Sequence, residues 1–351
     1  MTASQSTRRS GREPSIADVA RLAGVAQGTV SNVLNRPNKV SEKTRLRVER
    51  AIDSLGFVRN GTARGLASGT RTTIGFVIAD VSNSFFLDMA RGAEEVAQLA
   101  GNTLLLANSD MDLSKQGAYL NLFDEERVAG ILLAPLPRSL HHAASVRPHG
   151  RPRVILNADS GSTQVCSVAV DNELGGYLAT RHLIELGKRN LVFVGGPETL
   201  IPIRDRHRGA ERAVIEAHGE VRLDFIPTHE VRVEDGRKVG HSIAARERAD
   251  VPDGIVAGAD LLALGMLQSI VSESDLRIPD DIAIIGYDNN RSAWDSIVPI
   301  STVSQPGEEM GRNAARLLLE EVHTAGTHIH QHIVLEPTVV ARQSTIGPRK
   351  N

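Results

Sequence analysis

Cysteine is almost absent from this chain of 351 residues, and its single cysteine, Cys166, excludes an internal disulfide framework and is typical of a reducing compartment. Aromatic residues make up only 3% of the chain. No window approaches the roughly 18 apolar residues of a membrane-spanning helix. The opening stretch MTASQSTRRSGREPS carries charge but no apolar run, so no secretory signal is expected. These absences favour a cytoplasmic protein without a membrane segment.

What the sequence does contain is a marked charge asymmetry. Residues 1–71 hold 13 Lys+Arg and 5 Asp+Glu, a balance of +8, whereas the rest of the chain holds 27 and 37, a balance of −10. One interpretation of the basic segment is a solvated tail. Because its charges are interleaved with a helical apolar pattern, a folded domain that meets a polyanion is the better interpretation.

Three short helices are predicted in the first sixty residues. The first covers residues 16–23 after the N-cap Ser15, the second runs from about residue 26 to 35, and the third covers residues 42–55 after Ser41. Two helices joined by a short turn that contains glycine, with a third helix behind them, predict a helix-turn-helix domain. The alternative is an ordinary three-helix bundle with a solvated polar face.

The second helix has small and amide side chains on the face opposite its apolar residues. Amides can pair bidentately with adenine, and small residues let a helix approach base edges closely. We therefore assign base reading to Gln27, Gly28 and Asn32. Residues placed to contact the DNA backbone are Arg21, Thr29, Ser31 and Lys39.

The stretch SIADVARLAGVAQGTVSNVLNRPNKVSEKTRLRVERAIDSLGF resembles, nearly throughout and without gaps, the DNA-binding headpiece of the LacI-type (lactose repressor) family of transcriptional regulators. The resemblance implies a homodimer on a pseudo-palindromic operator. The sequence departs from the family pattern at Ala26, where serine is common, and at Asn32, where arginine is common. Because arginine prefers guanine and asparagine prefers adenine, one base of each half-site is expected to differ.

Residues 59–73, RNGTARGLASGTRTT, have two glycines within ten residues, which makes a poor isolated helix or a flexible linker. The resemblance implies instead a hinge helix that folds on operator DNA. In that interpretation Leu66 is the apolar wedge in the minor groove, and Asn60 and Arg64 contact the DNA backbone.

From residue 72 onward, short apolar strands alternate with helical segments of roughly a dozen residues. The predicted strands are TTIGFVIAD, TLLLANSD, GILLAP, RVILNAD, SVAVDN, NLVFVGG, GIVAGAD and DIAIIGYD. This pattern predicts an α/β architecture of doubly wound parallel sheets, in two lobes, with a ligand at the carboxyl ends of the strands. Motifs such as RDRHRGAERA and RIPDDIAIIGYDN resemble the family's effector domain, which is similar to periplasmic sugar-binding proteins.

The predicted organisation is a small all-α helix-turn-helix headpiece followed by a periplasmic-binding-protein-like domain. Its parts are a disordered basic tail (1–13), the headpiece (14–59), a hinge helix or linker (60–71) and an effector-binding and dimerisation domain (72–346). The resemblance implies crossings between lobes near residues 170, 301 and 331. Lobe one is thus expected at about 72–170 and 301–330, and lobe two at about 171–300 and 331–346. No heptad follows the ARQST segment, so a dimer is favoured over a tetramer.

Polar and aromatic residues at strand ends are the effector-binding candidates. Arg206 and Asp288 match the family's effector-binding arginine and aspartate, and such a pair suits a polyhydroxylated ligand. The other candidates are Asp80, Ser82, Asn83, Phe85, Phe86, Arg204 and Trp294. For the two phenylalanines and Trp294, a core or subunit-contact role is the alternative. A sugar or sugar derivative is the favoured effector, but GYDNN followed by Arg291 also resembles the purine-repressor branch, which keeps a nucleobase open.

The segment HIHQH places His328, His330 and His332 at alternate positions. Imidazoles about 7 Å apart along a strand cannot all reach one ion without a bend, and no cysteine or acidic cluster accompanies them, so a solvated strand end and no metal site are expected. No nucleophile elbow, metalloprotease helix or phosphate-loop lysine occurs either, so we expect neither enzymatic activity nor a cofactor. The sequence predicts an effector-controlled repressor, and the alternative is a small-molecule sensor without DNA-binding activity.

Overall fold

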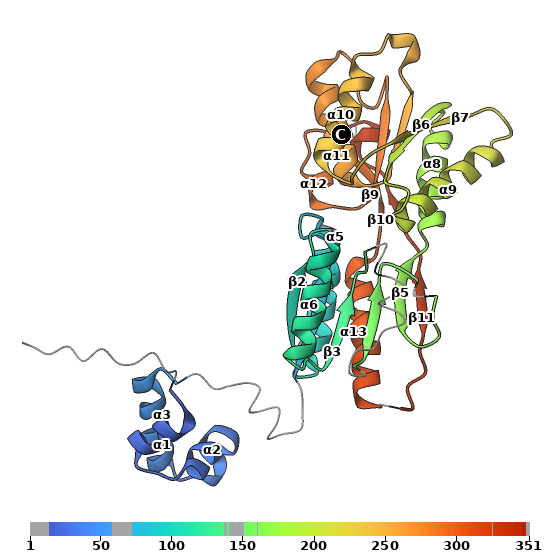
Figure 1. Cartoon of the computed structure of the whole chain (residues 1–351). Coiled ribbons are helices and arrows are strands. Elements are labelled where there is room, and N and C mark those ends of the chain that lie inside the picture. Colours follow the sequence, from blue (N-terminus) through green and yellow to red (C-terminus); the bar gives the residue numbers. More distant parts are fainter. Residues whose placement is uncertain are drawn as a thin grey trace, which may run out of the picture. The chain divides into compact units, whose positions relative to one another are not determined.

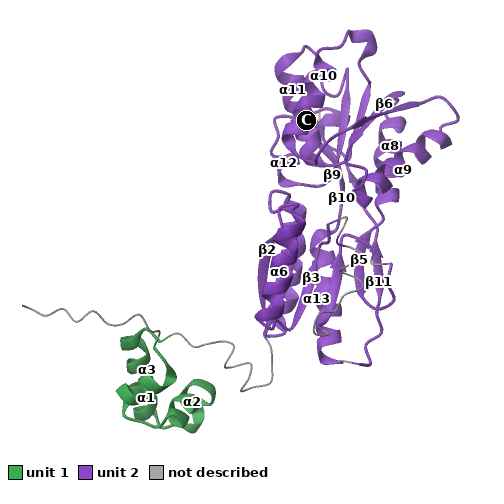
Figure 2. Cartoon of the chain, viewed as in Figure 1, with its two compact units in different colours: residues 1–70 green, residues 71–351 purple. Residues whose placement is uncertain are grey.

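The structure is a computed structural model that describes residues 14–57, 72–136, 139, 151–159, 161–324 and 326–348. The chain divides into two compact units, residues 1–70 and 71–351, which Figure 2 colours separately. The predicted tail at 1–13 and the predicted hinge at 60–71, with Asn60, Arg64 and Leu66, lie outside the described residues.

The first unit contains the three predicted helices and a short 3-10 turn. They are α1 (Ile16–Ala23), α2 (Gln27–Asn35), η1 (Pro37–Lys39) and α3 (Glu42–Leu55). Ser15 begins α1 with a capping box, because its hydroxyl accepts from the backbone of Asp18 and the Asp18 carboxylate accepts from the backbone of Ser15. Val19, Val30 and Val48, one from each helix, are fully buried and form the centre of the core. The apolar stripes predicted from sequence therefore meet in one small core.

The second unit consists of two lobes, each built on a six-stranded sheet (Figure 1). The lobe-one sheet has the order β11-β5-β4-β3-β1-β2, with all strands parallel. These strands are β1 (Thr73–Ile78), β2 (Thr103–Asn108), β3 (Gly130–Leu133), β4 (Arg153–Leu156), β5 (Cys166–Val170) and β11 (His332–Leu335). Helices α5 (Ser84–Leu99) and α13 (Gly307–His323) pack on one face, and α6 (Leu113–Glu125) packs on the other.

The lobe-two sheet has the order β12-β10-β9-β8-β6-β7, in which only the pairing of β12 with β10 is antiparallel among the described residues. Its strands are β6 (Asn190–Gly195), β7 (Arg222–Pro227), β8 (Gly254–Ala257), β9 (Ala283–Asp288), β10 (Ser301–Ser304) and β12 (Thr338–Val340). One face carries α8 (Asn172–Glu185) and α9 (Ile201–Glu216), and the other carries α10 (Val233–Ala244) and α11 (Asp260–Glu273). The shorter elements are η3 (Arg248–Asp250), α12 (Arg291–Trp294) and α14 (Gln343–Ile346). Helices on both faces of parallel sheets confirm the predicted doubly wound fold class.

Two of the three crossings between lobes differ from the sequence-based expectation. The expectation assigned residues 301–304 to lobe one and residues 332–335 to lobe two. In the structure β10 pairs with β9 of lobe two, and β11 pairs with β5 of lobe one. Each of these strands completes the sheet of the lobe that the chain is about to leave, so the crossings follow β10 and β11 instead of preceding them.

Candidate functional site

The exposed face of α2 carries the residues predicted to read bases. Gln27, Gly28 and Asn32 are all exposed, whereas Val30 and Val33 on the opposite face are buried. A Cβ atom added at Gly28 would meet nothing within 4 Å, so the surface there is open to an approaching duplex. A helix face of this shape matches the requirements of a recognition helix in a major groove.

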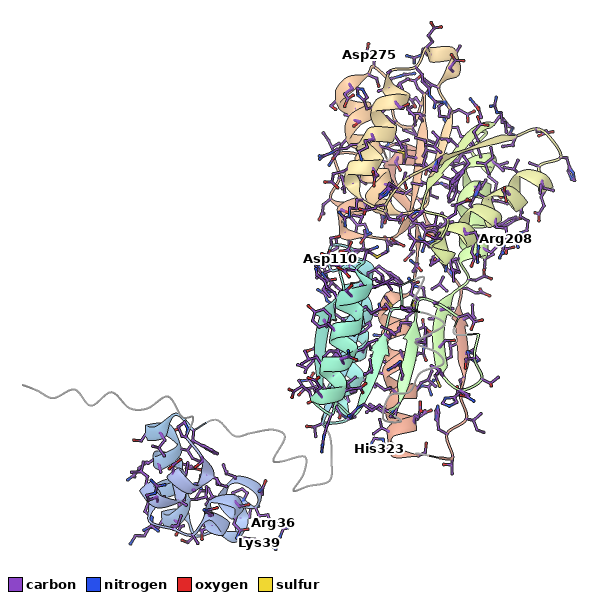
Figure 3. All side chains as sticks on the ribbon, viewed as in Figure 1. Arg36, Lys39, Asp110, Arg208, Asp275 and His323 are labelled. Carbon is purple, nitrogen blue, oxygen red and sulfur yellow. The ribbon has the colours of Figure 1, made fainter. Side chains whose placement is uncertain are left out.

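The residues predicted to contact phosphates surround this face. Arg21 and Lys39 are exposed, while Thr29 and Ser31 are half-buried. Figure 3 shows Lys39 projecting outward from the first unit. Ala26 is the N-cap of α2 and provides no side-chain hydrogen bond to the helix, as the departure from serine predicts. The first turn of α2 therefore keeps free N–H groups that can donate to a phosphate.

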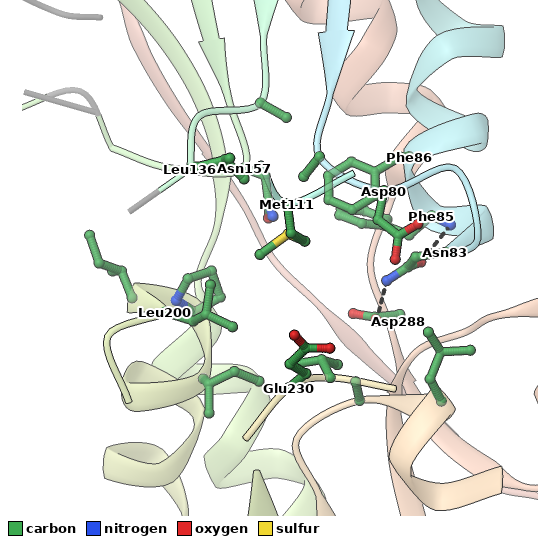
Figure 4. A pocket seen from close by; sticks show the side chains of 18 of the residues that line it. Asp80, Asn83, Phe85, Phe86, Met111, Leu136, Asn157, Leu200, Glu230 and Asp288 are labelled. Carbon is green, nitrogen blue, oxygen red and sulfur yellow. Dashed lines mark hydrogen bonds between the residues drawn. The ribbon is translucent and has the colours of Figure 1, made fainter. Parts of the chain in front are cut away.

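A cavity of about 570 Å³ lies between the two lobes of the second unit. Figure 4 shows that Asp80 and Asn83 enter it from lobe one, and that Asp288 and Glu230 enter it from lobe two. Its apolar lining includes Phe85, Phe86, Met111, Leu136, Leu200 and Leu261. Its polar lining includes Asp80, Asn83, Asn157, Arg206, Thr228, Glu230, Asp288 and Gln305. A mostly apolar cavity with a few convergent polar groups is typical of a small-molecule site.

Arg206 is fixed at the lobe-two wall of the cavity by four contacts. Its Nε donates to Asn172 Oδ1 at 2.9 Å, and its Nη1 donates to the carbonyl oxygen of Gly258 at 2.6 Å. Nη1 also lies 3.4 Å from Asp288 Oδ1, and the guanidinium stacks 3.6 Å from the centre of the Tyr287 ring. Because Arg206 is only 4% exposed, this framework holds the guanidinium in one orientation before any ligand arrives.

Asp288 joins the two lobes at the floor of the cavity. It accepts from Asn83 Nδ2 of lobe one at 3.0 Å and from Gln305 Nε2 at 2.6 Å (Figure 4). Its backbone has a φ of 103°, a conformation that side-chain-bearing residues rarely adopt and that is found at functional sites. Burial raises the pKa of the Asp288 carboxyl, and the Arg206 guanidinium acts in the opposite direction. The carboxylate is thus a shared acceptor whose partners come from both lobes.

A second carboxyl, that of Asp260, lies beneath this floor and is fully buried. Its Oδ2 accepts from the backbone N–H of Asn290 at 2.6 Å. Burial raises the pKa of Asp260 well above its usual range, and the charge of Asp288 raises it further. Two neighbouring buried carboxyls favour a state in which one of them holds a proton.

The structure gathers six of the nine predicted effector residues at the cavity: Asp80, Asn83, Phe85, Phe86, Arg206 and Asp288. The other three do not line it. Ser82 donates to Asp80 Oδ2 at 2.7 Å, and Arg204 lies 3.6 Å from Asp205. Trp294 is 49% exposed and donates from Nε1 to Asn289 at 2.7 Å.

Several cavity residues were missed by the sequence reasoning. Asn157 directly follows β4, so the rule that ligands bind at the carboxyl ends of strands would have found it. Glu230 follows β7, an edge strand that was not predicted because its side chains alternate in burial and include charges. Met111 and Gln305 carry no comparable signal, since the former lies in a turn and the latter in a crossing segment.

The expectation that no cysteine accompanies the histidine segment is wrong, because the fold places Cys166 next to two of the histidines. Cys166 Sγ lies 3.2 Å from His328 Nε2 and 3.6 Å from His330 Nδ1. The third histidine, His332, instead contacts Ser167 Oγ at 2.8 Å. Cys166 is more than 160 residues away in sequence, and the pairing of β5 with β11 brings it to the histidines.

Residues 15–60 match the family model described as bacterial regulatory proteins, lacI family, and residues 180–345 match a periplasmic binding protein-like domain. The chain is 32% identical over 336 residues to the HTH-type transcriptional repressor PurR of Aliivibrio fischeri, which covers 95% of this chain and 99% of that protein. It is 34% identical to PurR of Vibrio atlanticus, over 94% of this chain and 98% of that protein.

Among solved structures, the transcriptional regulator CelR in complex with cellobiose is 30% identical, with a TM-score of 0.65 over 94% of this chain and 99% of that chain. The lac repressor dimer bound to operator and the anti-inducer ONPF has a TM-score of 0.75 at 22% identity, over 95% of this chain and 99% of that chain, which shows a shared fold.

Proposed function

Because the chain belongs to the lacI family of bacterial regulatory proteins, it is a helix-turn-helix repressor that binds DNA, and we propose that a small molecule held between its two lobes sets its affinity for the operator. The observation that carries this proposal is a cavity between the lobes in which Asn83 of lobe one donates a hydrogen bond to Asp288 of lobe two. A ligand that competes for Asp288 acts on both lobes at once. Because such a ligand contacts both lobes, it stabilises one arrangement of the lobes over another.

In the proposed complex with DNA, α2 contacts the bases and the residues around it contact the phosphates. Gln27, Gly28 and Asn32 read base edges in the major groove. Arg21, Thr29, Ser31 and Lys39, together with Asn60 and Arg64 of the hinge segment, hold the DNA backbone. The protein acts as a homodimer, as in the solved lac repressor dimer on its operator, so the operator has matching two-fold symmetry.

In this proposal Leu66 wedges into the minor groove at the centre of the operator. Leu66→Ala is expected to lower affinity for the operator while sparing non-specific, salt-sensitive binding to DNA. Binding measured on operator and on random duplex at several salt concentrations separates the two effects. Equal loss on both duplexes would contradict the wedge.

The effector is proposed to be a sugar or sugar derivative. The Arg206 guanidinium, whose Nε and Nη1 donate to protein acceptors, donates to a ligand hydroxyl, while Asp288 accepts from another. The apolar wall formed by Phe85 and Phe86 offers a surface for the C–H face of a sugar ring. The structural relative CelR is in complex with cellobiose, which supports this class of ligand. The PurR relatives make nucleobases the necessary comparison ligands.

The proposed site of action is the cytoplasm, where DNA is accessible. Among the residues that the structure describes, no helix is both long enough and apolar enough to cross a membrane. The relatives are transcriptional regulators, and we propose that the Arg206–Asp288 pair binds its ligand without converting it. Incubation with candidate sugars followed by product analysis tests this point, because turnover would contradict it.

The experiment that tests the function as a whole is selection of bound sequences from a random duplex pool. The purified full-length chain is used at a stated salt concentration, without ligand and with pooled sugars or nucleobases. Enrichment of one palindrome, changed by one ligand pool, is the expected result. Enrichment only in the presence of a pool identifies a corepressor, and loss of enrichment identifies an inducer. No enrichment under any condition would overturn the repressor in favour of a sensor that does not bind DNA.

A further inference from the structure

A second chemically distinctive cluster lies in lobe one at the edge of the sheet away from the cavity. The cavity is lined by residues that follow the carboxyl ends of β1 and β4, whereas Cys166 is the first residue of the parallel strand β5. The segment that contains His328 and His330 leads into β11, the neighbour of β5. The cluster is therefore separate from the proposed effector site, and its ligand is independent of the proposed function.

The three side chains of this cluster point their ligand atoms at one another. Cys166 Sγ lies 3.2 Å from His328 Nε2 and 3.6 Å from His330 Nδ1. All three atoms lie within 4.8 Å of one another. A thiol and two imidazoles, brought together from positions more than 160 residues apart in the sequence, are the donor types of zinc sites.

The spacing of these atoms matches a tetrahedral ion. Zinc bonds of about 2.3 Å to sulfur and about 2.0–2.1 Å to nitrogen, at a tetrahedral angle, place sulfur and nitrogen about 3.6 Å apart. Of the two observed sulfur–nitrogen distances, 3.6 Å equals this value and 3.2 Å is slightly shorter, so an ion requires only a small adjustment of the side chains. The two imidazole rings are 5.2 Å apart between centres and nearly perpendicular, and their ligand nitrogens lie within 4.8 Å of each other.

The surroundings of the sulfur suit a thiolate. Cys166 is fully buried, and its Sγ accepts a hydrogen bond from the backbone N–H of Gln331 at 3.3 Å. A donor to sulfur stabilises its negative charge. The Glu321 carboxylate of α13 is also buried and lies 3.9 Å from His330 Nδ1, so a further anionic group faces the cluster and offsets the charge of a dication.

We propose that Cys166, His328 and His330 bind Zn²⁺, with a water molecule in the fourth position. On binding, the Cys166 thiol releases its proton to solvent, and the thiolate and two neutral imidazoles each donate a lone pair to the ion. A soft thiolate with imidazoles favours zinc over magnesium or calcium. The ion ties the segment before β11 to the start of β5 and so stabilises the edge of the lobe-one sheet. The competing interpretation is a hydrogen bond between the thiol and an imidazole without any metal.

The test is cobalt substitution of full-length protein that carries no histidine tag. Protein treated with a chelator is titrated with Co²⁺ alone, and the absorption spectrum is recorded. A tetrahedral site with a thiolate ligand gives intense visible bands together with a sulfur-to-cobalt charge-transfer band in the near ultraviolet. The expected result is saturation of both at a single equivalent per chain, with displacement by Zn²⁺ and a higher unfolding temperature in the presence of Zn²⁺.

Cys166→Ser is expected to remove the charge-transfer band, and His328→Ala and His330→Ala are expected to weaken Co²⁺ binding at least tenfold. The two histidine variants keep the buried sulfur, so they test the site even if Cys166→Ser fails to fold. The matched control is His323→Ala, an exposed histidine at the end of α13 (Figure 3), which should bind as the unaltered chain does. Absence of stoichiometric binding, or visible bands without thiolate charge transfer, would overturn the proposal and leave only the thiol–imidazole hydrogen bond.

Discussion

Asn32 is the residue at which the operator preference of this chain should depart from that of its family. Its side chain is exposed on α2, so a substitution there leaves the helical core intact. Asn32→Arg is expected to shift one base of each half-site from adenine to guanine, with a discrimination of about 1–3 kcal/mol at that position. Binding to a panel of operators varied at single positions measures the change.

The control for Asn32 is a residue that meets phosphate instead of a base. Lys39→Ala should weaken binding by a similar factor on every operator in the panel and reduce the slope of log affinity against log salt by about one unit. If Asn32→Arg behaves in this uniform way, or Lys39→Ala changes the preferred base, the assignment of these two residues is wrong.

Asp260 gives the molecule a dependence of stability on pH whose direction follows from its burial. Its folded-state pKa is raised, so the folded protein binds the proton more tightly than the unfolded chain does. The contribution of Asp260 to stability is therefore fully present below the unfolded pKa of about 3.9 and is lost as pH rises through the folded value. Asp260→Asn keeps an oxygen that can accept from Asn290 and carries no charge at any pH.

As pH rises, the free energy of unfolding of Asp260→Asn should increase relative to that of the unaltered chain. The full difference is about 1.4 kcal/mol for each unit by which folding raises the pKa of Asp260. Urea unfolding at about pH 5 and about pH 8 checks this difference. A variant that loses stability equally at both pH values would show that the carboxyl is needed as an anion and that its folded-state pKa is not raised.

At the scale of elements, the position of Arg206 depends on close packing of α8 against α9. A Cβ atom at Gly176 of α8 would overlap the carbonyl oxygen of Arg206. Gly176→Ala is therefore expected to push the helices apart, to destabilise lobe two by about 1–3 kcal/mol and to weaken effector binding. Thermal unfolding and ligand titration measure the two effects.

Gly117→Ala is the matched control for this packing prediction. Gly117 lies within α6, and a Cβ atom there would meet nothing within 4 Å. The same substitution should leave effector binding unchanged and stabilise the helix by up to about 1 kcal/mol. If the two variants behave alike, close packing at Gly176 does not position Arg206.

The same scale shows what the sequence could and could not predict. Buried strands such as β1 and β9 were predictable because a continuous apolar run of that length has few other solutions. The edge strand β7 was missed because half of its side chains face solvent and polar residues interrupt the pattern, and the segment of β11 was expected only as a solvated strand end, with residues from 331 assigned to lobe two. The Cys166–His330 contact was not predicted because it depends on the pairing of β11 with β5 in lobe one, whereas residues from 331 were expected in lobe two.

At the scale of the whole molecule, the function requires that the cavity in one unit and the DNA-binding surface in the other influence each other. If an effector changes operator affinity by some factor, operator must change effector affinity by the same factor. Asn83 is the residue through which this coupling can be altered. Its Oδ1 caps α5 by accepting from Phe85 N at 3.0 Å, and its Nδ2 donates to Asp288 of the other lobe at 3.0 Å.

Asn83→Asp keeps the cap but places a carboxylate against the carboxylate of Asp288. Repulsion between two carboxylates in a buried site should separate the lobes at this point and weaken effector binding at least tenfold. Asn108→Asp is the control, because Asn108 Oδ1 accepts from the backbone N–H groups of Val81 and Asp110, which both belong to lobe one.

Titrations of effector with and without operator, and of operator with and without effector, give the coupling factor in both directions. For Asn83→Asp this factor should move toward unity equally in both titrations, while the preferred operator sequence stays the same because the base-reading face of α2 is untouched. An unchanged coupling factor would mean that the hydrogen bond between the lobes does not transmit the effector signal. The DNA-binding surface would then have to respond to another part of the cavity, and the wall that carries Arg206 would be the next place to look.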